Sequence, residues 1–238
     1  MADRKAPVKT TSGNVAAKAS SRGDVDAFLK EVRGLQPASS GRGRLIFAMD
    51  ATMSRQPSWD MALSLQGDMF RAVKEVGGLD VQLMYFRGFN ECQPSRWVGD
   101  PDALARLMRQ VHCEGGHTQI RKVLSHARDE NNKQKVDALV YVGDCMEEDI
   151  DQLSQLAGEL GLIGVPVFVF QEGNDPRAAQ AFKEIARLSR GAYCRFDAGS
   201  AGQLRELLTA VAVYATGGRK ALAKSESGAA VRLLEQLG

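Results

Sequence analysis

The sequence has little net charge, few cysteines and no long hydrophobic run, and each shortage argues against a class of protein. Its 238 residues contain 31 Lys and Arg against 29 Asp and Glu, a formal net charge of +2. No general attraction to nucleic acid or to an anionic membrane is therefore expected. No apolar run has the length of a signal-peptide core or reaches the roughly 18 residues of a membrane span, which predicts a cytoplasmic protein.

The cysteines are too scattered for a disulfide framework or a zinc ribbon. There are four of them, without C-x-x-C spacing: Cys92, Cys113, Cys145 and Cys194. Zinc binding by His112, Cys113 and His117 would lack a second matching cluster. A nucleophilic Cys113 or Cys145 with His117 as base would lack a recognisable third group to orient the base. Neither interpretation is favoured.

What the chain does have is enough apolar residues, 44%, to bury the core of one domain with tails. Residues 1–43 are expected to form a disordered basic tail and a short amphipathic helix over residues 25–32. Residues 44–216 are expected to form the main domain. Residues 217–238 are expected to form a linker and a short helix that could dock on the domain.

Apolar strands alternate with amphipathic helices through residues 44–216. Strands are expected at residues 44–49, 81–86, 92–97, 136–142, 165–170 and 192–196, the second and third joined as a hairpin. Helices are expected to begin at Ser58, after Asp100, after Thr118, near Ile150, after Asp175 and at Ser200, the first ending near Val76 and the last near Tyr214. This alternation predicts an α/β fold with a Rossmann-like, open, mostly parallel six-stranded sheet, one antiparallel edge strand and helices on both faces.

The first strand runs into a group of oxygen-bearing side chains. Five apolar residues, 45–49, are followed by Asp50, Thr52 and Ser54 at alternate positions. These are hard oxygen donors of the kind that hold Mg²⁺. In an open parallel sheet, ligands bind outside the carboxyl ends of the strands, so Thr118 before a helix and Asp144 after a later strand could meet the first group there.

With these motifs in this order, the chain resembles the von Willebrand factor A (VWA) domain family over about residues 44–215. The metal ion-dependent adhesion site of that family uses a D-x-S-x-S loop, a threonine from a second loop and an aspartate from a third. The resemblance implies that Asp50, Thr52, Ser54, Thr118 and Asp144 hold Mg²⁺ or Mn²⁺ and present it to an Asp or Glu of a partner protein. It also implies an intracellular bacterial type of member: a non-enzymatic adaptor whose partner is an AAA+ ATPase or another assembly machine.

Two positions depart from the family pattern. Thr52 stands where the family usually has serine, which keeps the hydroxyl. Cys145 stands where a glycine often follows the third aspartate, and we expect it to tighten that loop. The acidic run from Glu147 to Asp151 is interpreted as a solvated helix start favoured by the helix dipole. Trp59 is expected to pack beneath the first helix.

Three alternatives remain open for the same residues. Asp50 and the hydroxyls after it could simply cap the next helix. An aspartate at the end of a first parallel strand also begins the haloacid dehalogenase motif of Mg²⁺-dependent phosphohydrolases, but Thr52 stands in place of that motif's second acid. RNA binding through the basic tail is opposed by the near-neutral charge and by the lack of an aromatic and basic stripe.

Overall fold

The computed structural model describes residues 42–73, 78–196 and 200–237. The predicted tail and the predicted helix over residues 25–32 lie outside these ranges, as does the predicted end of the first domain helix near Val76. The predicted site residues Asp50, Thr52, Ser54, Thr118 and Asp144 all lie within the described ranges.

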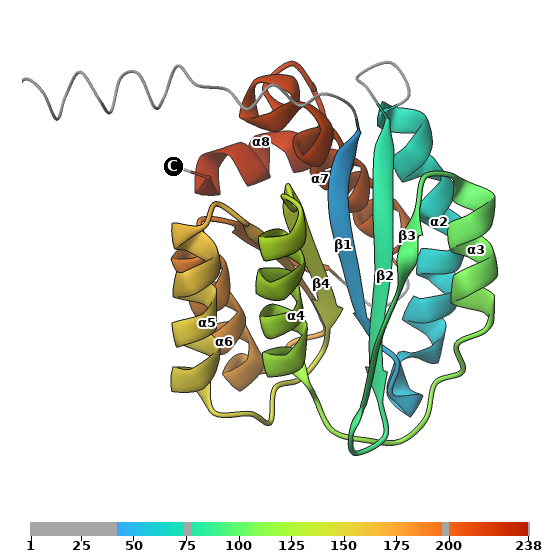
Figure 1. Cartoon of the computed structure of the whole chain (residues 1–238), viewed down its shortest axis with the longest axis vertical. Helices are drawn as coiled ribbons and strands as arrows, with labels where there is room; N and C mark the ends of the chain where they lie inside the picture. The colour runs from blue at the N-terminus through green and yellow to red at the C-terminus, as the bar shows by residue number, and fades with distance from the viewer. Residues whose placement is uncertain (1–41, 74–77, 197–199, 238) are drawn as a thin grey trace, which may run out of the picture. The chain divides into compact units, whose positions relative to one another are not determined.

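Six strands form a single sheet in the order β3-β2-β1-β4-β5-β6 (Figure 1). They are β1 (Gly43–Asp50), β2 (Leu79–Arg87), β3 (Glu91–Val98), β4 (Ala138–Gly143), β5 (Val167–Glu172) and β6 (Ala192–Phe196). Neighbouring strands are parallel except β2 and β3, which form an antiparallel hairpin. The predicted mostly parallel sheet with one antiparallel edge strand is confirmed.

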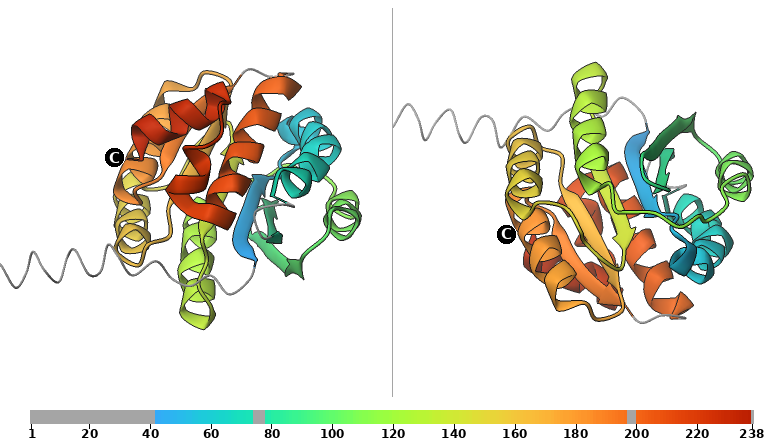
Figure 2. Two further views of the ribbon diagram at one scale, coloured as in Figure 1. Left: turned by 90° about the horizontal axis from the view of Figure 1, so that it is seen from above. Right: turned by 90° about the horizontal axis from the view of Figure 1, so that it is seen from below.

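Helices cover both faces of this sheet (Figures 1 and 2). They are the short 3-10 helix η1 (Met53–Arg55), α2 (Gln56–Val73), α3 (Pro101–Arg109), α4 (Ile120–Lys133), α5 (Ile150–Leu162), α6 (Pro176–Leu188), α7 (Ala201–Leu222) and α8 (Gly228–Gln236). Helices α2, α3, α7 and α8 contribute to one hydrophobic core and α4, α5 and α6 to the other. The sheet therefore lies between two helical layers.

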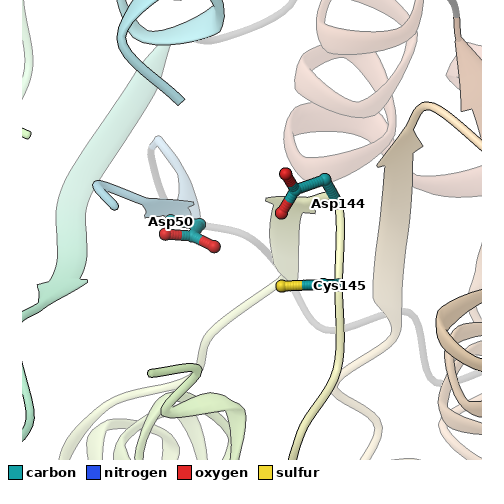
Figure 3. Close-up of side chains that lie close together, drawn as sticks. All are labelled: Asp50, Asp144 and Cys145. Atoms are coloured by element: carbon teal, nitrogen blue, oxygen red, sulfur yellow. The ribbon is translucent and has the colours of Figure 1, made fainter. Parts of the chain in front are cut away.

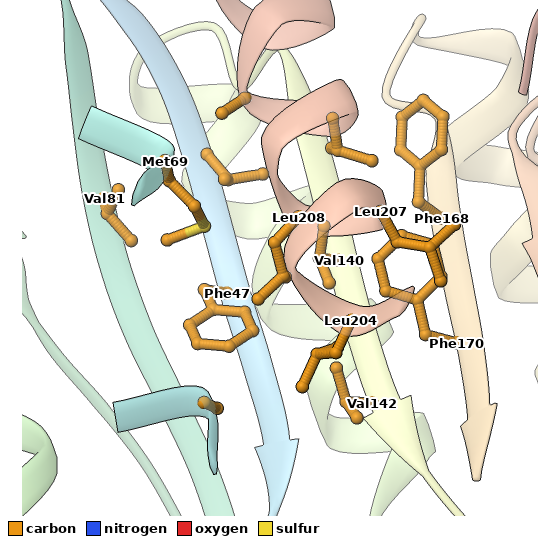
Figure 4. Close-up of a cluster of buried hydrophobic side chains, with 14 of the residues drawn as sticks. Phe47, Met69, Val81, Val140, Val142, Phe168, Phe170, Leu204, Leu207 and Leu208 are labelled. Carbon is orange, nitrogen blue, oxygen red and sulfur yellow. The ribbon is translucent and has the colours of Figure 1, made fainter. Parts of the chain in front are cut away.

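Strand β1 is buried on both faces, which explains its unbroken apolar run. Phe47 and its alternate neighbours face the core beneath α2 and α7, where Met69 and Leu208 also lie (Figure 4). Ile46 and Ala48 face the core beneath α4, α5 and α6. Packing on both sides holds the end of β1, where the candidate site begins, in one position.

Two of the predicted helix starts are confirmed by their capping contacts. The Asp100 carboxylate accepts a hydrogen bond from Ala103 N at 2.8 Å, and the Asp175 carboxylate accepts one from Arg177 N at 2.7 Å. A proline follows each aspartate as the first helical residue. Both starts depend on neighbours in the sequence, because a cap satisfies amide groups only two or three positions away.

Two other predicted caps are wrong. Helix α2 begins at Gln56, so Ser58 lies inside its first turn, and the Ser58 hydroxyl donates to Glu172 at the end of β5. Ser200 precedes α7 but its side chain makes no capping hydrogen bond. For Ser58 the reason is a tertiary acceptor that the local pattern does not reveal.

Helix α7 continues past its predicted end at Tyr214. It runs to Leu222, with a break at Gly218, where φ is 64° and ψ is −167°. A positive φ of this kind favours glycine, so the backbone changes direction close to residue 217, where the linker was expected to begin. In the ranges given above, neither α7 nor another helix is long and apolar enough to cross a membrane.

Candidate functional site

The candidate site lies at the carboxyl ends of β1 and β4, which are adjacent parallel strands. Asp50 is the last residue of β1 and is fully buried, and Asp144 directly follows β4. Strand pairing therefore brings the two carboxylates together: a ligand atom from each lies within 4.8 Å of the other (Figure 3). This is the meeting of strand ends that the sequence predicted.

Only one of the two Asp50 carboxylate oxygens has a hydrogen-bond partner among the described residues. Its Oδ1 accepts a hydrogen bond from Thr52 N at 2.7 Å, whereas Oδ2 is buried and has no partner among the described residues. Burial, with a smaller contribution from nearby Asp144, raises the pKa of Asp50 to about 6, against the lowering effect of the Thr52 contacts and of Arg55. The hydrogen bond from Thr52 closes the loop after β1, so the Asp50 side chain serves this loop and not the start of α2.

In Asp144 too, one carboxylate oxygen has partners and the other has none among the described residues. Ser54 Oγ donates to Asp144 Oδ2 at 3.4 Å, and Arg55 Nη1 lies 3.7 Å from the same oxygen. The other oxygen, Asp144 Oδ1, is buried without a partner among the described residues. A buried acceptor without a donor costs roughly 1–3 kcal/mol, more when it is charged. The two free oxygens are therefore well placed for a cation.

A buried ion pair lies beside these carboxylates, and no sequence pattern predicted it. Arg55 Nη2 contacts Glu172 Oε2, and the two side chains are only 3% and 10% exposed. Ser58 donates to the same Glu172 oxygen. The position of Arg55, directly after the predicted ligand Ser54, was a local sign that it could belong to the site. Its partner Glu172 could not be found in this way, because it lies at the end of β5, far away in the sequence.

Thr118 joins the site through the loop that follows Asp144. It is buried, its Oγ1 accepts a hydrogen bond from Glu147 N at 3.2 Å, and its own N–H donates to Glu147 Oε2 at 3.1 Å. The next residue, Glu148, accepts from Ile120 N at 2.5 Å and from Arg121 N at 3.0 Å, and so caps α4. Among the predicted ligands, direct contacts connect Asp50 with Thr52 and Ser54 with Asp144, whereas Thr118 is linked through Glu147.

The prediction of a solvated acidic helix start is wrong for Glu148, which is half-buried and caps α4. Glu147 is exposed as predicted, but its carboxylate accepts from Thr118 N instead of serving the start of α5. The prediction holds for Asp149, whose carboxylate accepts from Asp151 N at 2.9 Å and from Gln152 N at 3.1 Å at the start of α5. Trp59 packs as expected: it is buried, and its indole N–H donates to Met108 O at 3.1 Å.

Exposed apolar side chains flank the site. Met53, next to Ser54 in η1, is 65% exposed, and Phe89, at the tip of the β2–β3 hairpin, is 81% exposed. The Phe89 ring lies 5.2 Å from the ring of His117, which precedes Thr118. His117 N donates to Gly88 O at 3.0 Å, and this close approach needs Gly116, since a Cβ there would meet the Gly88 backbone at 2.0 Å.

The cysteines do not support nucleophilic chemistry. Burial raises the pKa of Cys113 to about 11 and that of Cys145 to about 12, and Asp144 adds to the second shift. The reactive thiolate is therefore disfavoured at both. In the described part of the chain, the residues that converge as a potential metal-binding group are Asp50, Asp144 and Cys145, not the histidines of the loop before α4.

No family model matches the sequence, and no curated protein matches it. Solved structures do match. A von Willebrand factor type A protein from Catenulispora acidiphila aligns with a TM-score of 0.60 at 11% identity, over 74% of this chain and 43% of that one. The SpRpn10 VWA domain aligns with a TM-score of 0.54 at 13% identity, over 79% and 97% of the two chains.

A third match is proximal thread matrix protein 1 from the mussel byssus, in a form with a zinc-occupied metal ion-dependent adhesion site (MIDAS) motif. Its TM-score is 0.57 at 16% identity, over 72% of this chain and 45% of that one. The chain thus spans less than half the length of two of these three proteins. At such identities the similarity establishes the fold alone, and the chain has a VWA-like α/β fold.

Proposed function

We propose that this chain is a non-enzymatic binding module that holds Mg²⁺ or Mn²⁺ and presents it to an Asp or Glu of a partner protein. Asp50, Thr52, Ser54, Thr118 and Asp144 would hold the cation, directly or through water. The observation that carries the proposal is the pair of buried oxygens, Asp50 Oδ2 and Asp144 Oδ1, which have no hydrogen-bond donor among the described residues.

The donor set fits such a cation. Carboxylate and hydroxyl oxygens are the ligands that Mg²⁺ and Mn²⁺ prefer. The hydroxyls of Thr52, Ser54 and Thr118 are neutral, so the bound cation keeps much of its charge and can accept a carboxylate from outside. The zinc-occupied MIDAS motif of the mussel byssus protein supports a metal at this place in the fold.

The surroundings of the site support a protein as the ligand. Met53 and Phe89 expose large apolar side chains beside it. Such side chains near a charged centre suit a partner that places an apolar residue next to its acidic one. An AAA+ ATPase or another assembly machine is the kind of partner that the family resemblance implies.

Thermal unfolding with and without metal tests the proposal. A ligand bound by the folded state alone raises the melting temperature, by about 5–10 °C at a hundredfold excess over its Kd. We expect millimolar Mg²⁺ or Mn²⁺ to stabilise the wild-type protein and the Asp102→Ala variant, which lacks an exposed aspartate of α3. Asp50→Ala should lose the effect.

Partner capture tests the second half of the proposal. Bait protein should retain a partner in Mg²⁺ and release it in chelator, and Asp50→Ala bait should not retain it. If a partner is retained as well by Asp50→Ala bait, or in chelator, as by wild-type bait in Mg²⁺, a metal does not bridge the two proteins. Absence of any metal-dependent stabilisation would reject the metal site itself.

A further inference from the structure

Cys145 brings a sulfur into a group of oxygen donors. One ligand atom from each of Asp50, Asp144 and Cys145 lies within 4.8 Å of the other two. Figure 3 shows the side chains of Asp144 and Cys145 directed from the end of β4 toward Asp50. Of the four cysteines in the sequence, Cys145 is the one that takes part in such a group within the described ranges.

The position of Cys145 is held from both sides. On one side Gly143 ends β4, and a Cβ there would meet the Tyr141 Oη at 2.5 Å, so the strand end is closely packed. On the other side Glu147 and Glu148 bond to the segment that leads into α4. These contacts hold the backbone on both sides of Cys145, whose sulfur lies within 4.8 Å of an oxygen of each carboxylate.

A second observation supports a cation in this space. The Asp50 side chain is fully buried, and its Oδ2 has no hydrogen-bond partner among the described residues. Oxygen donors alone would favour Mg²⁺, but a thiolate is a soft ligand that Mg²⁺ binds poorly and Zn²⁺ or Co²⁺ binds well. The mixed set of two carboxylates and one sulfur therefore suits a thiophilic cation.

We propose that Asp50, Asp144 and Cys145 form a binding site for a thiophilic divalent cation of the Zn²⁺ class, with Cys145 Sγ as a direct ligand. On binding, the metal–sulfur bond replaces the S–H bond and the proton passes to solvent. Ligand atoms around one tetrahedral zinc lie about 3.5 Å apart, so the group has to close by about 1 Å. Asp144 and Cys145 are both partly exposed.

Three protein ligands leave a fourth tetrahedral position open, as in zinc sites that accept an outside ligand. The inference rests on the proposed function only for what fills that position, an acidic side chain of the partner. The identity of the three protein ligands is independent of it, and the two ideas can fail separately.

Cobalt absorption tests the ligand set directly. Co²⁺ bound to a thiolate has an intense charge-transfer band in the near ultraviolet, and Co²⁺ bound only to oxygen lacks it. Titration of the reduced full-length protein with Co²⁺ should produce this band with one equivalent of metal. The band should disappear in Cys145→Ser and persist in Cys113→Ser, since Cys113 belongs to the loop before α4 and lies outside the three-residue group.

A cadmium-113 spectrum of the wild-type protein makes the test independent of how the variants fold. One sulfur ligand should move its resonance downfield of the all-oxygen region. Absence of the charge-transfer band in the wild-type protein, or its loss in Cys113→Ser instead of Cys145→Ser, would overturn the inference.

Competition between metals separates this inference from the proposed function. We expect Cys145→Ser to lower Zn²⁺ affinity by about tenfold or more, and by a larger factor than it changes Mg²⁺ affinity. Equal Zn²⁺ affinities in the two proteins would reject Cys145 as a ligand even if metal-dependent partner binding is found. A cobalt–thiolate band without metal-dependent partner binding would support the site and reject the proposed function.

Discussion

Arg55 and Glu172 form a buried ion pair beside the two carboxylates of the candidate site. Arg55 Nη2 contacts Glu172 Oε2, and Nη1 lies 3.7 Å from Asp144 Oδ2. Arg55 and Ser54 together engage one oxygen of Asp144 and leave the other free. When ionised, the carboxylates of Asp50, Asp144 and Glu172 outnumber the guanidinium by two charges, which one divalent cation would balance.

Breaking this pair from one side should be costly. Arg55→Met leaves Glu172 buried without its counter-charge, and the expected loss is about 3–5 kcal/mol of unfolding free energy. Arg55→Met combined with Glu172→Leu removes both charges and should be less destabilised than either single variant. Urea denaturation of the four proteins in chelator measures the coupling.

The exposed pair Arg187 and Glu184 on α6 is the control for this cycle. It is solvated, so its variants should show no measurable coupling. If the effects of Arg55→Met and Glu172→Leu simply add, the buried pair does not act as a unit.

The raised pKa of Asp50 predicts how the stability of the metal-free protein depends on pH. Because the folded-state pKa is about 6 and the ordinary value is 3.8, the folded state prefers the protonated carboxyl. This preference is fully present below about pH 4 and is lost as the pH rises through about 6. Asp50→Asn, which mimics the neutral form, should therefore be more stable than wild type by up to about 3 kcal/mol at pH 7.5 in chelator.

The difference should shrink as the pH falls from 6 to 4. Denaturation midpoints at several pH values measure it, with Asp102→Asn as an exposed control. Saturating metal should reverse the order, because wild type gains binding energy that Asp50→Asn cannot. If the metal-free Asp50→Asn protein is less stable than wild type at pH 7.5, the Asp50 carboxylate does not carry an unbalanced charge that destabilises the folded state.

Glu148 should stabilise both α4 and the candidate site. Glu148→Ala removes the acceptor of two amide groups in the first turn of α4, and the expected cost is about 1–2 kcal/mol. Since Thr118 lies only two residues before Ile120, metal affinity should fall as well. Calorimetric metal titration measures the second effect. Glu235→Ala, an exposed substitution on α8, is the control and should change neither the stability nor the metal affinity. If Glu148→Ala leaves the metal affinity unchanged, the Glu148 cap stabilises α4 without contributing to the metal site.

Phe89 should contribute to partner binding without contributing to metal binding. Its side chain is 81% exposed at the hairpin tip, and covering it in a complex would be worth about 1.5–3 kcal/mol. Phe89→Ser should weaken metal-dependent partner capture by about tenfold or more and leave the metal-induced thermal shift unchanged. Leu162→Ser is a matched control, since Leu162 is 82% exposed at the opposite end of α5. Equal loss in both variants would mean that the effect is not specific to the face around the site.

The order and type of the elements could be predicted from the sequence because their signals are local. The unbroken apolar run of β1 reflects burial on both faces, and the Asp-Pro starts of α3 and α6 need only neighbouring amides. Strand pairing then follows from the alternation of strands and helices. The errors at Ser58 and Glu148 have one cause: each side chain found a hydrogen-bond partner in a different part of the chain.

The sequence by itself determined that Asp50 and Asp144 lie where strands end, Asp50 as the last residue of β1 and Asp144 directly after β4, since the apolar runs before them are read from neighbouring residues. Only the tertiary structure decided how each carboxylate is used. It put Arg55 against Glu172, left one buried oxygen free on each aspartate, and turned Cys145 toward the same space. These contacts join separate strand ends, and their geometry depends on how two helical layers pack on the sheet, which a linear pattern of residues does not encode.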